Sequence, residues 1–119
     1  GFRVTLLTIV QEPLEDYFAT EREKTSWMEE ARRKADELVA KHREAMVQGG
    51  FPEESVAALV VVRQCNSIGE CILDARRELG AQTVVIGRRG LSKREEFIFG
   101  STSNKILHSA HDCCVWVVE

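Results

Sequence analysis

Two short runs of glycine, arginine and hydroxyl residues have the types and spacing of a site for a phosphate-bearing ligand. The sequence reads Gly87-Arg88-Arg89-Gly90, then nine residues, then Gly100-Ser101-Thr102. Glycine lets a ligand approach the backbone closely. The N–H groups at the start of a helix attract anions through unpaired donors and the helix dipole. The hydroxyls of the second run can bind a phosphate and the arginines of the first can neutralise it, so the loop predicts a nucleotide site.

Other interpretations of the same loop are open. It lacks the Gly-Lys-Ser/Thr end of a Walker loop and is not the dinucleotide pattern Gly-x-Gly-x-x-Gly. Gly87 and Gly90 as simple turn residues, with Arg88 and Arg89 in solvent, are the alternative. No nucleophile, base and orienting group can be assembled from the spacing, so we expect no catalytic residues.

The four cysteines fit neither a zinc site nor a disulfide framework. They are Cys65, Cys71, Cys113 and Cys114. A zinc site needs paired thiols two to four residues apart, and repeated. Disulfide frameworks are typical of chains with less core than this one. We therefore expect reduced, half-buried thiols in a cytosolic protein.

Apolar periodicity predicts four strands alternating with three helices. The strands are the segments 4–10, 55–62, 83–86 and 115–118, and the helices cover about 21–48, 68–79 and 101–109. Strands this continuously apolar are typical of sheets covered on both faces. Ser67 and Glu70 have the spacing of a helix capping box, and glycines follow the first two helices.

This alternation indicates an α/β fold, an open parallel sheet with helices on both faces and right-handed βαβ connections. Ligands of such sheets bind at the carboxyl ends of strands, and the loop after Ile86 lies at such an end. The 119 residues, 44% of them hydrophobic, with a net charge of −3, describe one ordinary domain. No apolar run reaches the ~18 residues of a membrane span. The mildly acidic balance argues against nucleic acid as the main partner.

The spacing Gly-x2-Gly-x9-Gly-Ser resembles the signature of the ATP-binding branch of the universal stress protein family. Further segments resemble the family in order along the chain. Residues 4–10 are similar to its second strand, 83–87 to its fourth, and 113–118 to its closing segment, where Cys-Cys replaces the usual Cys-Pro. The resemblance covers essentially the whole chain.

The resemblance implies a regulatory module of the stress response that binds ATP, AMP or ADP, with Mg²⁺ as a candidate companion ion. The phosphates would bind Gly87, Arg88, Arg89, Gly90, Gly100, Ser101 and Thr102. Ile9, at the end of the first strand, would contact the adenosine. At most slow ATP hydrolysis, a cytoplasmic location and a homodimer through Val115–Val118 are also implied. The alternatives are a divergent stress-protein domain without nucleotide, acting through dimerisation or a partner, and an enzyme on a related scaffold.

The family's first strand and helix have no counterpart here, so we expect residues 1–119 to form a single domain that is incomplete at its N-terminus. The family sheet has the order 3-2-1-4-5, which places the missing strand between segments 4–10 and 83–86. Its absence would leave two rows of buried backbone groups unpaired. We expect a preceding strand and helix in this place. A partner chain and direct pairing of the two segments are the alternatives.

Overall fold

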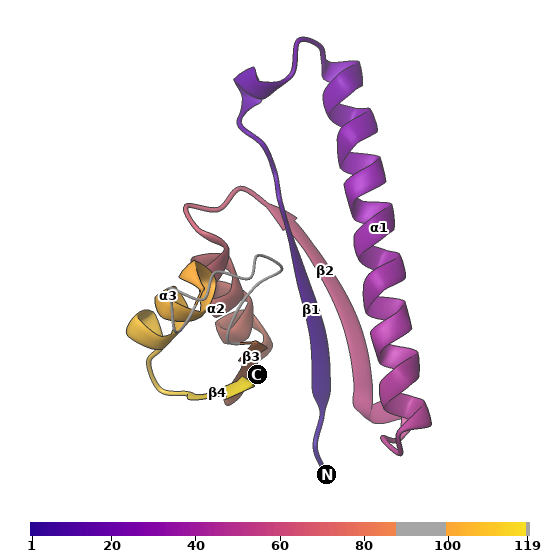
Figure 1. Ribbon diagram of the computed structural model, residues 1–119, viewed down its shortest axis with the longest axis vertical. Helices are drawn as coiled ribbons and strands as arrows, with labels where there is room; N and C mark the ends of the chain where they lie inside the picture. Colours follow the sequence, from indigo (N-terminus) through magenta and orange to yellow (C-terminus); the bar gives the residue numbers. More distant parts are fainter. Residues whose placement is uncertain (88–99, 119) are drawn as a thin grey trace. The chain divides into compact units, whose positions relative to one another are not determined.

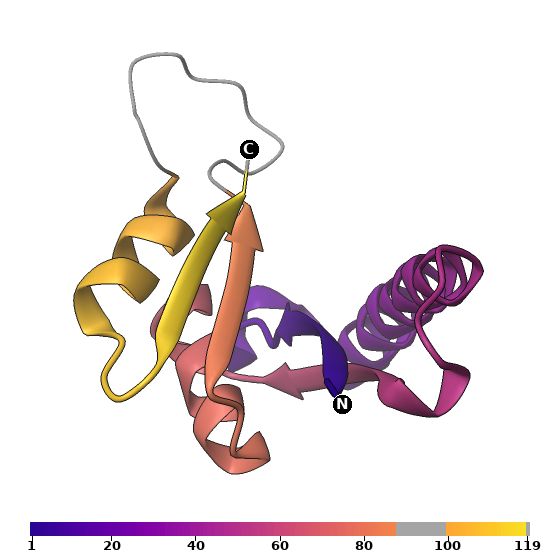
Figure 2. The ribbon, with the colours of Figure 1, turned by 90° about the horizontal axis from the view of Figure 1, so that it is seen from below.

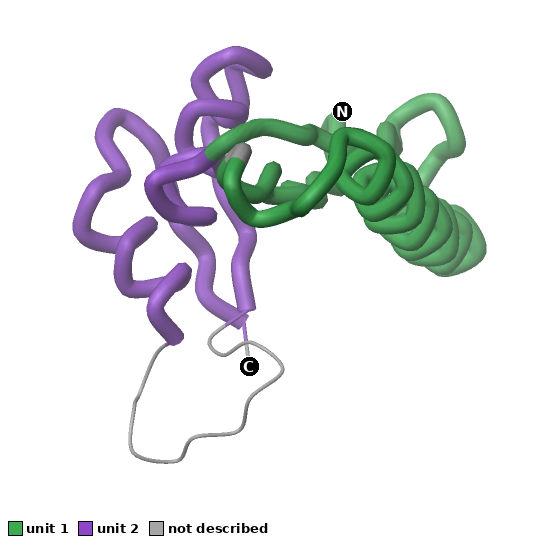
Figure 3. The backbone as a smooth tube through the Cα atoms, turned by 90° about the horizontal axis from the view of Figure 1, so that it is seen from above, with its two compact units in different colours: residues 1–64 green, residues 65–119 purple. Residues whose placement is uncertain are grey.

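The computed structural model describes residues 1–87 and 100–118, and its helices and strands follow the predicted order (Figure 1). They are β1 Val4–Gln11, α1 Glu21–Gln48, β2 Val56–Arg63, α2 Ile68–Leu79, β3 Thr83–Gly87, α3 Ser101–Ser109 and β4 Cys114–Val118. The structure also contains two short 3-10 turns that the sequence analysis does not predict, Glu15–Tyr17 and Glu53–Ser55. The chain divides into unit 1, Gly1–Gln64, and unit 2, Cys65–Glu119 (Figure 3).

In unit 1, the long helix α1 runs along the parallel strands β1 and β2 (Figure 1). The helix begins after Thr20, whose hydroxyl accepts a hydrogen bond from the Glu23 N–H at 3.1 Å. Arg43 ties the helix to the start of β2, because its guanidinium donates to the carbonyls of Glu53 and Val56, each at 2.8 Å. The buried residues of this unit are Val10, Ala35, Val39 and Val56.

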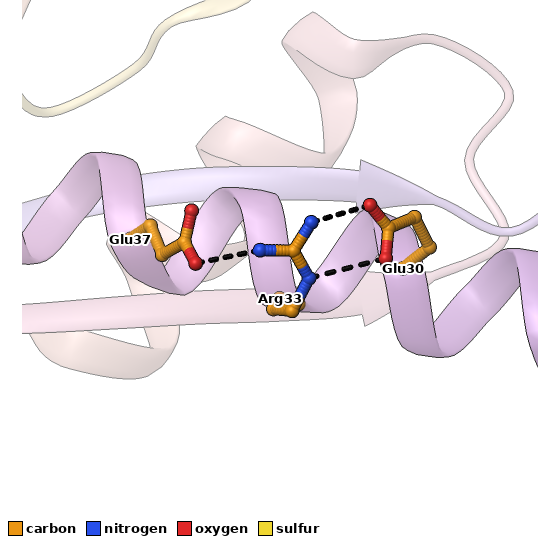
Figure 4. Close-up of polar contacts among 3 residues, drawn as sticks. All are labelled: Glu30, Arg33 and Glu37. Atoms are coloured by element: carbon orange, nitrogen blue, oxygen red, sulfur yellow. Dashed lines mark hydrogen bonds and ion pairs between the residues drawn. The ribbon is translucent and has the colours of Figure 1, made fainter.

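The outer face of α1 carries an ion-pair triad (Figure 4). Arg33 donates to Glu30 at 3.1 and 2.5 Å and to Glu37 at 2.6 Å. The hydrogen bond from Arg33, aided by its charge, lowers the pKa of Glu30 below its ordinary 4.5. The two carboxylates in turn raise the pKa of Arg33. Pairs at these spacings support an exposed helix locally, so this face serves helix stability and solvation.

In unit 2, α2 and α3 pack on one face of the parallel strands β3 and β4 (Figure 2). Leu73 of α2, Val84 of β3 and Ile106 of α3 form the buried cluster at the centre of this unit. Helix α2 begins as predicted, because the Ser67 hydroxyl accepts a hydrogen bond from the Glu70 N–H at 3.2 Å. Gly80 ends it with a left-handed φ of 67°, a conformation that suits glycine.

The strands form two separate parallel pairs, β1 with β2 and β3 with β4. The predicted α/β class with parallel strands is confirmed. The segments 4–10 and 83–86 belong to different units, and their direct pairing, one of the alternatives above, stays a prediction. That a further strand pairs with both of them, and that the domain is incomplete, stays a prediction.

The strands are less buried than the sequence predicts. Val84 of β3 is 9% exposed, but its neighbour Val85 is 60% exposed and lies opposite Trp116 of β4, which is 61% exposed. Alternate residues of a strand point to opposite faces, and α2 and α3 cover the Val84 face. The prediction that residues 83–86 are covered on both faces is therefore wrong within unit 2.

Candidate functional site

The described ends of the glycine loop are Gly87, the last residue of β3, and Gly100, which precedes α3. Gly100 has φ −70° and ψ 167°, an extended conformation open to any residue. A positive φ is therefore not the reason for a glycine at this position. The helical ladder begins with the Asn104 N–H, which donates to the Gly100 carbonyl at 3.0 Å. The N–H groups of the residues between them have no partner inside the helix.

The first turn of α3 is electrostatically suited to an anion. It contains no acidic residue, and Gly100 has no side chain to cap it. The other helices satisfy their own N-termini: Thr20 and Ser67 act as caps, and acidic residues follow in the first turn. Ser101 is exposed and Thr102 half-buried, so two hydroxyls accompany backbone donors that have no partner inside the helix. This arrangement can bind a phosphate group.

Ser103 holds the two ends of the loop together. Its hydroxyl donates to the Gly87 carbonyl at 2.6 Å, and the residue is only 5% exposed. The bond fixes the start of α3 relative to the end of β3. The sequence pattern indicates no role for Ser103, and it predicts only the hydroxyls of the two preceding residues, Ser101 and Thr102, as phosphate ligands. Ser103 lies three residues before Ile106 and therefore on the same, buried side of the helix, and this spacing could have indicated its structural role.

A close contact between α2 and α3 also positions the first turn of α3. Gly69 of α2 is buried, and a Cβ built on it would lie 2.9 Å from the Cβ of Lys105 and 3.3 Å from the Thr102 carbonyl oxygen. The absent side chain therefore lets α2 approach α3 closely. Glu70 adds an ion pair to Lys105 at 3.2 Å. The first turns of the two helices are thus fixed against each other.

The predicted site residues fall into three groups. Gly87, Gly100, Ser101 and Thr102 lie at the described ends of the loop, and the structure brings these four together. Arg88, Arg89 and Gly90 lie outside the described residues. Ile9 is half-buried in β1 of unit 1, opposite Val61 of β2, and its predicted contact with the adenosine stays a prediction.

The prediction of four reduced thiols is wrong for one pair. Cys65 and Cys71 form a disulfide, while Cys113 and Cys114 are free. The segment before α2 is extended at Ser67 and turns into the helix there. This change of direction brings Cys65 next to a residue of the first helical turn. The spacing of the two cysteines in the sequence does not show this change of chain direction, so the sequence does not predict the Cys65–Cys71 disulfide.

Three further findings concern the described residues. They contain no group of three or more His, Cys, Asp or Glu side chains placed to hold a metal ion. A small pocket lies away from the Gly100 end of α3, between the last turns of α2 and α3, and Arg76 borders it. The Arg76 guanidinium donates to the carbonyls of Ala81 and His111, both at 3.2 Å, so this residue joins two turns of the fold. Within the described part of the chain, no helix is long and apolar enough to cross a bilayer.

Comparison with known proteins agrees with the architecture. Residues 1–119 match the model of the universal stress protein family. The universal stress protein Slr1101 of Synechocystis sp. (strain ATCC 27184 / PCC 6803 / Kazusa) is 36% identical over 53 residues, which are 44% of this chain and 48% of that protein. The chain thus matches about half the length of this relative.

The backbone also resembles that of the hypothetical protein MJ0577, with a TM-score of 0.78 and 18% identity over 99% of this chain and 76% of that one. At this identity, the likeness concerns the fold, and it agrees with the α/β class. The family match extends over every residue of the sequence. The chain belongs to the universal stress protein family.

Proposed function

We propose that this chain is a regulatory module that binds an adenine nucleotide, with the phosphates at the start of α3. The observation that carries the proposal is the N-terminus of α3. It follows a glycine, has no acidic residue in its first turn, and presents the hydroxyls of Ser101 and Thr102. A phosphate would accept hydrogen bonds from the N–H groups that have no partner inside the helix, and it would complement the helix dipole.

The sequence around this turn supports a nucleotide over a free phosphate. In the sequence, Gly87 at the end of β3 is followed by Arg88, Arg89 and Gly90, and the two arginines would supply positive charge. The glycine spacing resembles the ATP-binding signature described above, so ATP, AMP or ADP is the proposed ligand. Mg²⁺ would accompany the phosphates, and Ile9 would contact the adenosine side. The role is one of binding, with at most slow ATP hydrolysis, in the cytoplasm.

A second part of the proposal concerns self-association. Trp116 and Val118 of β4 are 61% and 52% exposed, and among the described strands β4 pairs only with β3. An apolar edge strand is a template for pairing with another copy. We propose an antiparallel homodimer through Val115–Val118. This surface also supports the alternative function, a stress-protein domain that works through dimerisation or a partner without nucleotide.

The test of the nucleotide site is the ATP dissociation constant of Gly100→Val beside that of the wild-type chain. A valine side chain at the cap would obstruct phosphate approach, so we expect affinity to fall at least tenfold, which corresponds to about 1.4 kcal/mol. Asn104→Val is the matched control, because it places the same side chain on an exposed position of the same helix. Equal affinity in the wild type and Gly100→Val would reject the site.

A further inference from the structure

We propose that the Cys65–Cys71 disulfide is a redox control of the α3 site: its reduction loosens the first turn of α2 and thereby weakens nucleotide binding. This inference rests on the function proposed above. The disulfide, the first turn of α2 and the first turn of α3 all belong to unit 2. Three contacts connect the two sulfurs to the first turn of α3.

The first contact is the disulfide itself, which encloses the start of α2. Cys65 lies two residues before the cap residue Ser67, and Cys71 lies in the first turn, where it is 3% exposed. The disulfide closes a ring of residues 65–71. Inside this ring, the Ser67 hydroxyl accepts a hydrogen bond from the Glu70 N–H and the Ser67 carbonyl accepts one from the Cys71 N–H, both at 3.2 Å. The covalent bond therefore holds the cap and the first turn in one arrangement.

The second contact carries this restraint to α3. Gly69 lies within the ring, and its backbone approaches the Lys105 side chain and the Thr102 carbonyl so closely that a Cβ would be only 2.9 and 3.3 Å from them. Glu70, also within the ring, pairs with Lys105 at 3.2 Å. A shift of the first turn of α2 would therefore move the residues that support Thr102.

The third contact connects Thr102 to the rest of the site. Its neighbour Ser103 bonds to the Gly87 carbonyl at 2.6 Å, and Ser101 provides the exposed hydroxyl at the helix start. An anion site of backbone donors depends on their fixed direction. Loosening this turn lowers affinity because the ligand must then order the turn when it binds.

The redox step uses a dithiol reductant. One of its thiolates attacks the sulfur of Cys65, which is the more exposed partner, and the S–S bond breaks. Cys71 leaves as a thiolate and takes up a proton. The second thiol of the reductant then attacks the mixed disulfide and releases Cys65. The products are two cysteine thiols and the oxidised, cyclic disulfide of the reductant, and an oxidant of the disulfide class reverses the reaction.

The experiment measures the ATP dissociation constant of the oxidised chain and of the chain reduced with dithiothreitol. We expect reduction to weaken binding roughly fivefold to tenfold, the lower end of typical coupling between sites. Cys65→Ser should bind with the lower affinity in both conditions. Cys113→Ser/Cys114→Ser is the matched control, because these cysteines are free, and it should respond to reduction like the wild type.

Hydrogen exchange of residues 67–71 and 101–103 in both redox states separates this inference from the nucleotide proposal. Faster exchange in both segments after reduction supports the coupling, whether or not ATP binds. Equal ATP affinity in the two states, or unchanged exchange at 101–103, overturns it. If neither state binds ATP, the proposed function fails, and the exchange result alone decides the coupling. Cys65→Ser avoids the buried Cys71 position, so the variant tests the bond without disturbing the core.

Discussion

Single residues without reactive chemistry determine the geometry of the candidate site. Ser103 joins the end of β3 to the start of α3, and Gly69 lets α2 approach the same turn. The sequence pattern indicates the glycines and the hydroxyls of Ser101 and Thr102. The supporting residues were missed because their role depends on which residue they face, and a spacing rule does not contain that information.

The Ser103 hydrogen bond predicts a measurable loss of stability. Ser103→Ala leaves the exposed Gly87 carbonyl without the donor of this part-buried hydrogen bond, so the free energy of unfolding should fall by about 1 kcal/mol. Urea unfolding followed by circular dichroism measures the change. Asn104→Ala controls for the higher helix propensity of alanine at the exposed neighbouring position, and Ser103→Thr keeps the hydroxyl. Equal stability of the two alanine variants would contradict the role assigned to Ser103.

At the scale of elements, local signals predicted the helices and strands well. The helix at 101–109 has the predicted bounds, and α2 is capped by Ser67 and Gly80, as the sequence predicts. These features follow from contacts between residues close in sequence. Burial was predicted poorly, because the exposure of Val85 and Trp116 depends on which helices lie over each face.

The contact between α2 and α3 gives the prediction at this scale. Alanine normally stabilises a helix by up to ~1 kcal/mol relative to glycine. At Gly69, however, the new Cβ would lie 2.9 Å from the Lys105 Cβ, and overpacking of this kind costs roughly 1–3 kcal/mol. We expect Gly69→Ala to lower the melting temperature and to weaken ATP binding, because the two first turns must separate.

A Gly69→Ala chain with a raised melting temperature would show that the helices have room between them. Lys105→Ala in the Gly69→Ala background provides the matched test. It keeps the Lys105 Cβ but removes the Cγ, which lies equally close at 2.9 Å. Partial recovery of stability in the double variant would locate the strain at this contact.

For the whole molecule, the sequence predicted the α/β class and the family, and the chain's match to the family model agrees with both. It did not predict the Cys65–Cys71 disulfide, which depends on the turn-back before α2. The nucleotide, the dimer and an additional strand beside β1 and β3 are still predictions. Of these predictions, the dimer depends on the exposed surface of β4.

Replacing Trp116 by lysine tests the proposed dimer. The side chain is 61% exposed, so the change should leave the fold intact while placing a charge on the edge strand, where charges discourage pairing. We expect sedimentation equilibrium to give a dimer for the wild-type chain at micromolar concentration and a monomer for Trp116→Lys. Circular dichroism checks that both are folded. A wild-type chain that sediments only as a monomer would reject the interface.

The most direct test of the nucleotide claim is the identity of any small molecule that purifies with the wild-type chain. The chain is isolated under non-reducing conditions and denatured, and the released compounds are measured by mass spectrometry. A second portion of the same preparation is kept folded, freed of ligand by dialysis, and titrated with ATP. The account predicts an adenine nucleotide in the released fraction and saturable ATP binding by the emptied chain. No released nucleotide together with no binding of added ATP would contradict it.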